Sequence, residues 1–254
     1  MKKVMRATTS VCILLLTVAG CKKPAGQGSL NATATYTQID WNTAGTISGT
    51  IHISGKMPTP VQIDMAQDPA CNFAAANFSE QYVGRNGNLQ NVFIYVKDGL
   101  GNRMYPAPST PVIIDQKGCR YTPHVVGVMV GQRISFTNSD PTMHNVHMIP
   151  TVGGNQNVDI SQPPMGAAES RVFSQPELMI PVRCNNHPWM QAFINVVANP
   201  FFAVSNADGH FEIKGLPPGV YTIVANQEIL GQQTATVTVS SKQTAAQDFT
   251  FTAK

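Results

Sequence analysis

The stretch that decides the fold is Arg183-Cys184-Asn185-Asn186-His187-Pro188-Trp189-Met190. It holds a thiol, an imidazole and a thioether, Cys184, His187 and Met190, in the spacing C-x2-H-x2-M. A thiolate, two imidazoles and a weak axial thioether form the donor set that suits copper. The stretch supplies three of these four donors, so the fold must bring a second histidine to it. The alternative interpretation is that Cys184 and Met190 only fill the core and that His187 lies at the surface.

Strand parity selects the second histidine. Residues 143–148 contain His144 and His147, which are three positions apart and therefore face opposite sides of a strand. His144 shares its side with the apolar Val146 and Met148, and it is the predicted inward ligand. We expect His147 to be a solvated polar residue; the alternative is an exposed accessory ligand.

Alternation with period two runs through most of the chain from residue 45 onward, for example in residues 46–53, 91–96 and 133–138. No later stretch keeps a long 3.6-residue period, and proline and glycine interrupt the sequence throughout. This pattern predicts an all-β protein built of sandwiches. Residues 65–78 are the least regular, and they leave room for a short helix.

The first 20 residues are typical of a secretory signal peptide, with a basic beginning and an apolar run over residues 11–18. The run ends in Val18-Ala19-Gly20-Cys21, which resembles the lipobox of bacterial lipoproteins. The resemblance implies an exported protein that is held by a lipid on Cys21 to a bacterial membrane, facing the periplasm or the cell exterior. Residues 21–44 then read as a flexible tether. The alternative is an ordinary signal peptide with a chance cysteine.

Charge argues against a nucleic-acid partner. The chain has 17 Lys and Arg residues against 14 Asp and Glu residues. Three of the basic residues, Lys2, Lys3 and Arg6, leave with the signal peptide, so the mature protein is formally neutral. No cluster of basic residues suggests a phosphate-binding face.

The cysteines can be assigned one by one. Cys12 lies in the signal peptide, Cys21 is the predicted lipid site and Cys184 is the predicted thiolate, which leaves Cys71 and Cys119. In an oxidising compartment two remaining cysteines are most simply paired as a disulfide. The alternative is that one of them is a second metal ligand.

Residues 111–198 resemble the cupredoxins, which are Greek-key β-sandwiches that hold blue copper. The motifs that carry the resemblance are Tyr121-Thr122-Pro123, Gly131, Asn138-Ser139-Asp140, His144-Asn145 and the C-x2-H-x2-M loop. The resemblance implies that His144, Cys184 and His187 are trigonal copper ligands and that Met190 is the axial ligand. It also implies that Asn145 steadies the ligand loop by hydrogen bonding, and that His187 is the ligand nearest the surface. An alternative in which His124 joins a modified site is less consistent with this pattern.

Residues 199–254 resemble the carboxypeptidase regulatory-like domain, a smaller, transthyretin-type β-sandwich. The turn Asp208-Gly209 between two alternating runs is a strong hairpin signal. Strands of this family begin with a pattern that Ile47-Ser48-Gly49-Thr50-Ile51 fits. We therefore hypothesise that residues 45–110 supply the first half of this sandwich and that the cupredoxin is inserted between its two parts.

Together these resemblances imply a membrane-tethered carrier of single electrons with one type I copper site, without enzymatic activity. Its redox partner would be another protein, whose identity the sequence leaves open. Three alternatives remain at this point: a lipoprotein that binds and delivers copper without redox cycling, a copper enzyme, and a cupredoxin fold that binds no metal.

Overall fold

The computed structural model describes residues 35–72 and 76–253, and it folds them into β-strands joined by loops and turns. No helix occurs among these residues, so the predicted all-β class is confirmed. Turns occupy residues 66–72, where the sequence had left room for a short helix. Within the described part of the chain, no helix is long and apolar enough to cross a membrane.

The strands follow one another along the chain with short to moderate connections, except for the long segment between the first two. In order, they are β1 (Gly45–Ser54), β2 (Phe93–Asp98), β3 (Val112–Gln116), β4 (Tyr121–Thr122), β5 (Val125–Met129), β6 (Arg133–Asn138), β7 (His144–Met148), β8 (Val158–Gln162), β9 (Glu169–Val172), β10 (Glu177–Arg183), β11 (Gln191–Val197), β12 (Phe202–Val204), β13 (His210–Leu216), β14 (Gly219–Gln227), β15 (Gly231–Val239), β16 (Thr244–Ala246) and β17 (Phe249–Thr252).

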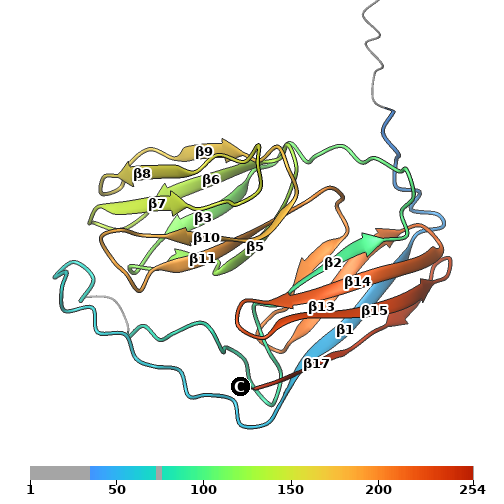
Figure 1. The fold of residues 1–254 in the computed structure, drawn as a ribbon, viewed down its shortest axis with the longest axis horizontal. Coiled ribbons are helices and arrows are strands. Elements are labelled where there is room, and N and C mark those ends of the chain that lie inside the picture. Colours follow the sequence, from blue (N-terminus) through green and yellow to red (C-terminus); the bar gives the residue numbers. More distant parts are fainter. Residues whose placement is uncertain (1–34, 73–75, 254) are drawn as a thin grey trace, which may run out of the picture. The chain divides into compact units, whose positions relative to one another are not determined.

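Strands β3 to β11 form two facing sheets, which we call the site sandwich (Figure 1). One sheet has the order β5-β11-β10-β7-β8 and the other the order β4-β3-β6-β9. Phe136, Val146, Val182 and Ile194 have no exposed surface and belong to one apolar core. Burying a large apolar side chain contributes about 1.5–3 kcal/mol, so this core holds the strands that carry the predicted ligands.

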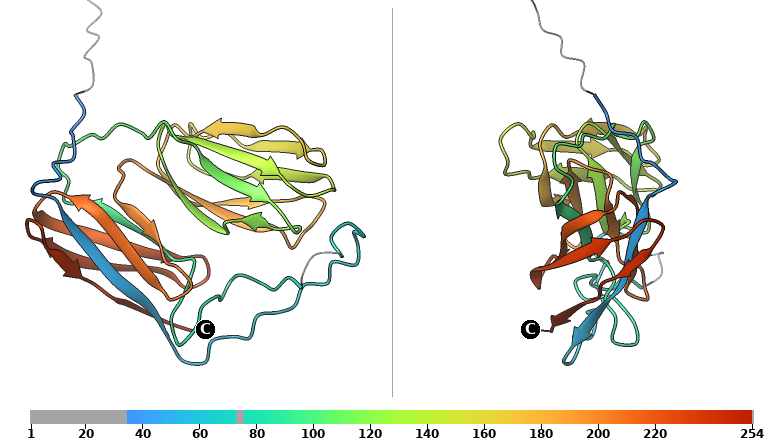
Figure 2. Two further views of the ribbon diagram at one scale, coloured as in Figure 1. Left: turned by 180° about the vertical axis from the view of Figure 1, so that it is seen from behind. Right: turned by 90° about the vertical axis from the view of Figure 1, so that its right-hand side faces the viewer.

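Strands β1, β2 and β12 to β17 form a second pair of sheets, which we call the terminal sandwich. In one sheet β1 lies between β13 and β16 and also pairs with β17. In the other sheet β2 lies between β12 and β14. Figures 1 and 2 show the blue β1 among the orange and red strands from the end of the chain. This is the arrangement expected if the site sandwich is inserted into the terminal sandwich.

The connection between β1 and β2 departs from the predicted segment 45–110. Its middle part leaves the terminal sandwich, and Met65 and Cys71 are buried in the core of the site sandwich. We call residues 61–72 and 76–80 the cap loop. Its two ends are hydrogen-bonded to each other, from the N–H of Ile63 to the carbonyl of Asn77 and from the N–H of Ser79 to the carbonyl of Val61, each at 2.8 Å.

The predicted signal peptide and the predicted lipid site Cys21 lie outside the described residues and stay predictions. Of the predicted tether, residues 35–44 are described. The N–H of Thr37 donates to the carbonyl of Met104 at 2.7 Å, and Lys242 donates to the carbonyl of Trp41 at 2.8 Å. These hydrogen bonds tie residues 35–44 to the folded chain, where the sequence analysis expected a flexible segment.

Candidate metal centre

The predicted ligands come from strand β7 and from the loop between β10 and β11. Cys184 directly follows β10, and His187 and Met190 lie in the loop that leads into β11. His144 is the first residue of β7. Because β10 pairs with β7 in antiparallel fashion, with Arg183 opposite His147, the loop that follows β10 runs back alongside the start of β7. The sheet order therefore brings residues 40 positions apart in the chain into contact.

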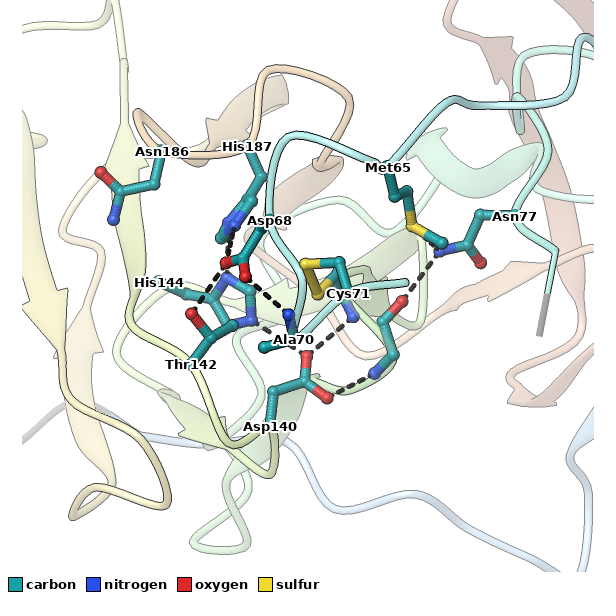
Figure 3. The surroundings of a disulfide bond; sticks show 12 residues. Met65, Asp68, Ala70, Cys71, Asn77, Asp140, Thr142, His144, Asn186 and His187 are labelled. Atoms are coloured by element: carbon teal, nitrogen blue, oxygen red, sulfur yellow. Dashed lines mark hydrogen bonds and ion pairs between the residues drawn. A yellow bond between two sulfur atoms is a disulfide. The ribbon is translucent and has the colours of Figure 1, made fainter. Parts of the chain in front are cut away.

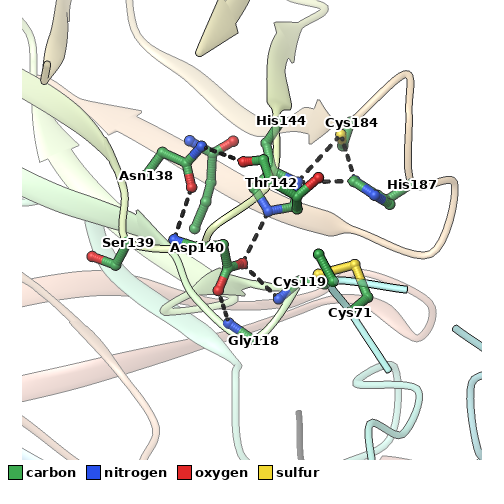
Figure 4. Close-up of polar contacts among 12 residues, drawn as sticks. Cys71, Gly118, Cys119, Asn138, Ser139, Asp140, Thr142, His144, Cys184 and His187 are labelled. Carbon is green, nitrogen blue, oxygen red and sulfur yellow. Dashed lines mark hydrogen bonds and ion pairs between the residues drawn. A yellow bond between two sulfur atoms is a disulfide. The ribbon is translucent and has the colours of Figure 1, made fainter. Parts of the chain in front are cut away.

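His144, Cys184 and His187 converge on one buried point (Figure 4). The Nδ1 atoms of the two histidines are 2.9 Å apart. The Sγ atom of Cys184 lies 3.5 Å from Nδ1 of His187 and 4.0 Å from Nδ1 of His144. His144 has no exposed surface, and Cys184 and His187 are each 3% exposed. Each of the three predicted trigonal ligands thus contributes one donor atom to the same small, buried volume.

In each histidine, the ring nitrogen that points away from the thiol contacts a carboxylate. Nε2 of His144 lies 2.9 Å from Oδ2 of Asp140, and Nε2 of His187 lies 2.9 Å from Oδ2 of Asp68 (Figures 3 and 4). A carboxylate accepts hydrogen bonds and an imidazole nitrogen that faces it donates. The hydrogen of each neutral ring therefore sits on Nε2, and each Nδ1 presents a lone pair.

This arrangement suits a bound cation. With both rings neutral and their hydrogens on Nε2, two lone pairs face each other at 2.9 Å and repel, and a positive ion placed between them and the thiolate relieves that repulsion. The circle through the two Nδ1 atoms and the Sγ atom has a radius of about 2.1 Å, which matches first-row metal–imidazole bonds of roughly 2.0–2.1 Å. Carboxylate–histidine pairs of this kind commonly orient the ligands of metal ions. The residues present therefore fit a copper ion.

Burial acts on the charges of the site. Burial lowers the pKa of His144, the hydrogen bond to Asp140 opposes this change, and the neighbouring His187 adds to it; the net direction is downward. For Asp68, burial raises the pKa, but hydrogen bonds from His187, from the N–H of Ala70 and from Thr142 outweigh it, so the pKa is lowered. A neutral His144 is the form that a metal ligand needs.

The thiol of Cys184 accepts one hydrogen bond from the backbone, since the N–H of Asn145 lies 3.3 Å from its Sγ atom. The resemblance implied that Asn145 steadies the ligand loop by hydrogen bonding, and the structure gives its side chain partners on β8. It donates to Asp159 at 3.2 Å and to Ser161 at 3.1 Å, both on β8. Asp159 in turn accepts from Asn185 at 2.8 Å, so any effect of the Asn145 side chain on the loop passes through Asp159.

Met190 is 1% exposed and belongs to the same apolar cluster as Cys184. Its N–H donates to the carbonyl of His187 at 2.9 Å, and its carbonyl accepts from the N–H of Cys184 at 3.4 Å. These two hydrogen bonds close the loop on itself. The short spacing of the ligands along the sequence thus corresponds to a compact turn that holds them together.

Cys71 and Cys119 form a disulfide, with their Cα atoms 5.6 Å apart, so neither is a free thiol ligand. Cys184 is the free cysteine of the described chain. The disulfide lies beside the histidines (Figure 3). A ring nitrogen of His187 lies within 4.8 Å of the Cys71 sulfur, and a ring nitrogen of His144 lies within 4.8 Å of the Cys119 sulfur.

The remaining histidines considered from the sequence lie apart from the three-donor group. His147 is partly exposed, and its Nδ1 lies 3.1 Å from Oδ1 of Asn185. His124 contacts Glu228 at 3.1 Å, and burial lowers its pKa while the hydrogen bond to Glu228 and the nearby Glu80 raise it, with a net upward direction. Both ring nitrogens of His124 face acceptors, since Nδ1 lies 3.0 Å from the carbonyl oxygen of Gln191 and Nε2 faces Glu228, so neither nitrogen is turned toward the three-donor group.

Two residues that contact the histidines, Asp68 and Asp140, were not among the predicted site residues. Asp140 stands four positions before His144 and was part of the Asn138-Ser139-Asp140 motif, so its position held a signal. Besides contacting His144, its carboxylate accepts hydrogen bonds from the N–H of Gly118 at 2.6 Å and from the N–H of Cys119 at 2.7 Å. Asp68 is 119 positions away from His187, in a stretch without periodicity, and no local pattern points to it.

A known family model matches the end of the chain. Residues 185–252 match the family model of the carboxypeptidase regulatory-like domain. The match contains strands β12 to β17 of the terminal sandwich, and it begins earlier than the predicted boundary at residue 199, within the ligand loop. The predicted resemblance of this segment is confirmed. No curated protein sequence matches the chain.

The solved structures that resemble the chain include cupredoxins. A copper-containing nitrite reductase from Thermus scotoductus SA-01 is 20% identical, with a TM-score of 0.33, over 40% of this chain and 26% of its own. A Cu(I) amicyanin variant is 22% identical, with a TM-score of 0.31, over 34% of this chain and 81% of its own. A second Cu(I) amicyanin variant is 20% identical, with a TM-score of 0.31, over 42% of this chain and 98% of its own. The chain thus spans about a quarter of the nitrite reductase.

Proposed function

We propose that the site sandwich binds one type I copper ion and that the protein carries single electrons. His144, Cys184 and His187 would bind the ion, with Met190 as the axial ligand. The observation that carries this proposal is the buried triangle formed by two Nδ1 atoms and one thiol sulfur. Copper bound there would supply a one-electron couple between Cu(I) and Cu(II).

The surrounding residues support electron transfer because they hold the donors in place. Asp140 fixes the ring of His144, and Asp68 fixes the ring of His187. The loop between β10 and β11 is closed by its own hydrogen bonds. Donors that cannot move undergo little rearrangement when the charge of the ion changes, and a carrier needs no open position for a substrate.

Delivery of copper to another protein is the alternative function. It requires donors of the receiving protein to reach the ion. The four proposed ligands are at most 3% exposed, and the Nε2 side of His187 is covered by Asp68. His187 was expected to be the ligand nearest the surface, but Asp68 covers its ring edge at Nε2. This burial favours retention of the metal over its transfer.

The visible spectrum of the purified protein, without its signal peptide, tests the proposal after addition of Cu(II). We expect an intense sulfur-to-copper charge-transfer band that is lost in Cys184→Ser and in His144→Gln. His147→Gln is the matched control, because His147 lies on the same strand outside the donor group, and this variant should keep the band. A colourless Cu(II) complex of the unaltered protein would contradict the type I assignment.

Voltammetry then separates the two functions. A carrier gives a reversible one-electron wave and keeps its copper when a competing chelator is added. Rapid loss of copper to the chelator, without a reversible wave, would instead support delivery.

A further inference from the structure

The Nε2 side of His187 is covered by a residue from a distant part of the chain. Asp68 lies in the cap loop, and its Oδ2 atom accepts from Nε2 of His187 at 2.9 Å and from the hydroxyl of Thr142 at 2.9 Å. Its Oδ1 atom accepts from the N–H of Ala70 at 2.8 Å. The carboxylate is therefore held by three partners, and Figure 3 shows it between His187 and Thr142.

The cap loop is fixed to the site sandwich by bonds that do not involve the ligands. The disulfide joins Cys71, three positions after Asp68, to Cys119. On the other side of the loop, Asn77 donates to the carbonyl of Gly118 at 2.8 Å. Met65 is 6% exposed and packs in the apolar core. Asp68 is thus placed by the fold before any metal binds.

The contact has a defined chemical effect on the ring. A carboxylate that accepts from Nε2 keeps the hydrogen on that atom, leaves Nδ1 free to bind a metal, and makes Nδ1 a stronger electron donor. A stronger donor stabilises the higher charge of Cu(II) more than the lower charge of Cu(I). Loss of the carboxylate should therefore weaken Cu(II) binding more than Cu(I) binding.

We infer that Asp68 is a positioning residue that holds His187 in its metal-binding tautomer and lowers the reduction potential of the copper couple. The claim about the reduction potential rests on the proposed function. The claim about the tautomer of His187 concerns the protein's own residues and holds with or without metal. The disulfide serves this role by keeping the cap loop against His187.

The test compares Asp68→Ala and Asp68→Asn with the control Asp64→Ala. Asp64 is an exposed carboxylate of the same loop that accepts from the N–H of Ala66 and contacts no ligand. In the metal-free protein, nitrogen NMR of His187 should show hydrogen on Nε2 in the unaltered chain and in Asp64→Ala. Asp68→Ala should show a mixture of tautomers. Asp68→Asn retains an acceptor oxygen and should keep the original tautomer.

With copper bound, Asp68→Ala should lose about 10–100-fold in Cu(II) affinity, as for other partners of ligating histidines. Each tenfold loss that is specific to Cu(II) raises the one-electron potential by about 59 mV. Asp68→Asn should give a smaller rise, because its acceptor is neutral, and Asp64→Ala should give none.

Different results separate the two proposals. If the unaltered protein forms no blue copper complex, the proposed function fails, and the tautomer measurement still decides the role of Asp68. If Asp68→Ala folds with the tautomer and the potential of the unaltered protein, the inference is overturned. Should Asp68→Ala fail to fold, Asp68→Asn decides: an unchanged potential contradicts the tuning of the copper couple.

Discussion

His144 and Asp68 differ in how far their roles can be read from the chain. The parity of residues 143–148 predicted that His144 faces inward, because orientation along a strand is a local property, and the structure leaves it without exposed surface. The partner of His187 comes from 119 positions away. Such a contact depends on the path of an irregular loop, and neither composition nor period encodes that path.

Glu177 offers a test of electrostatics at a single residue outside the candidate metal centre. It is 8% exposed, and its carboxylate accepts from the N–H and hydroxyl of Thr151, the N–H of Val152 and the side chain of Asn155. Burial raises its pKa, but these hydrogen bonds outweigh burial and the net direction is downward. A carboxylate with a lowered pKa in the folded state stabilises the protein above its unfolded pKa and loses this effect as the pH falls through its folded pKa.

We therefore predict that Glu177→Gln lowers the free energy of unfolding by about 1–3 kcal/mol near pH 7. The difference from the unaltered protein should shrink as the pH falls below the ordinary range of a glutamate. Urea unfolding at neutral and acidic pH measures it. Glu169→Gln is the control, because Glu169 is half exposed and has one surface ion pair with Arg171, which is worth little. A Glu177→Gln difference that is constant with pH would contradict the explanation.

At the scale of elements, the contacts of β1 explain why this otherwise alternating strand contains Gly49. A Cβ atom added at Gly49 would lie 1.7 Å from the carbonyl oxygen of Gln247. The N–H of Gln247 donates to the carbonyl of Ser48 at 3.0 Å, so the two backbones are in direct contact. The residues linking β16 and β17 can approach β1 only where no side chain intervenes.

We predict that Gly49→Ala destabilises the protein by about 1–3 kcal/mol, the usual range for overpacking. Gly153→Ala is the matched control, because a Cβ atom there meets nothing within 4 Å. The control should be neutral or stabilising by up to about 1 kcal/mol. Thermal unfolding of both variants measures the difference. Equal stability of the two would show that β1 and the 247 segment can separate without cost.

The strands were easier to predict than the cap loop. Period-two alternation marks β1 and β13. In β13, Phe211 and Ile213 are buried while their neighbours His210 and Glu212 are exposed. The cap loop lacks alternation because hydrogen bonds, a disulfide and single anchors such as Met65 hold it. Its contact with the site sandwich, through Met65 and Cys71, therefore had no signal in the period-two pattern.

At the scale of the whole molecule, the terminal sandwich is discontinuous in sequence. The strands that pair with β1 are β13, β16 and β17, and all three come from the C-terminal segment. The site sandwich has its own core, whose buried side chains include Phe136 and Ile194. The stability of β1 therefore depends on a segment more than 150 positions later in the chain.

Deletion of residues 199–254 should accordingly expose β1. We predict that the amides of residues 45–54 lose their protection from hydrogen exchange and that this segment is cut early by proteases. The amides of β7 and β10 are the internal control and should stay protected, because their partners lie within the site sandwich. Retained protection of residues 45–54 would mean that β1 finds another partner, which contradicts the insertion of one sandwich into the other.

The disulfide between Cys71 and Cys119 has a consequence for how the protein matures. Three cysteines occur among the described residues, and of their three possible pairings only this one leaves Cys184 reduced. Thiol–disulfide exchange proceeds through free thiolates, so a metal ion bound early to Cys184 would act as a protecting group during oxidation. Among the described cysteines, a chain that has closed the Cys71–Cys119 bond has kept Cys184 reduced, which is the form that the proposed metal centre requires.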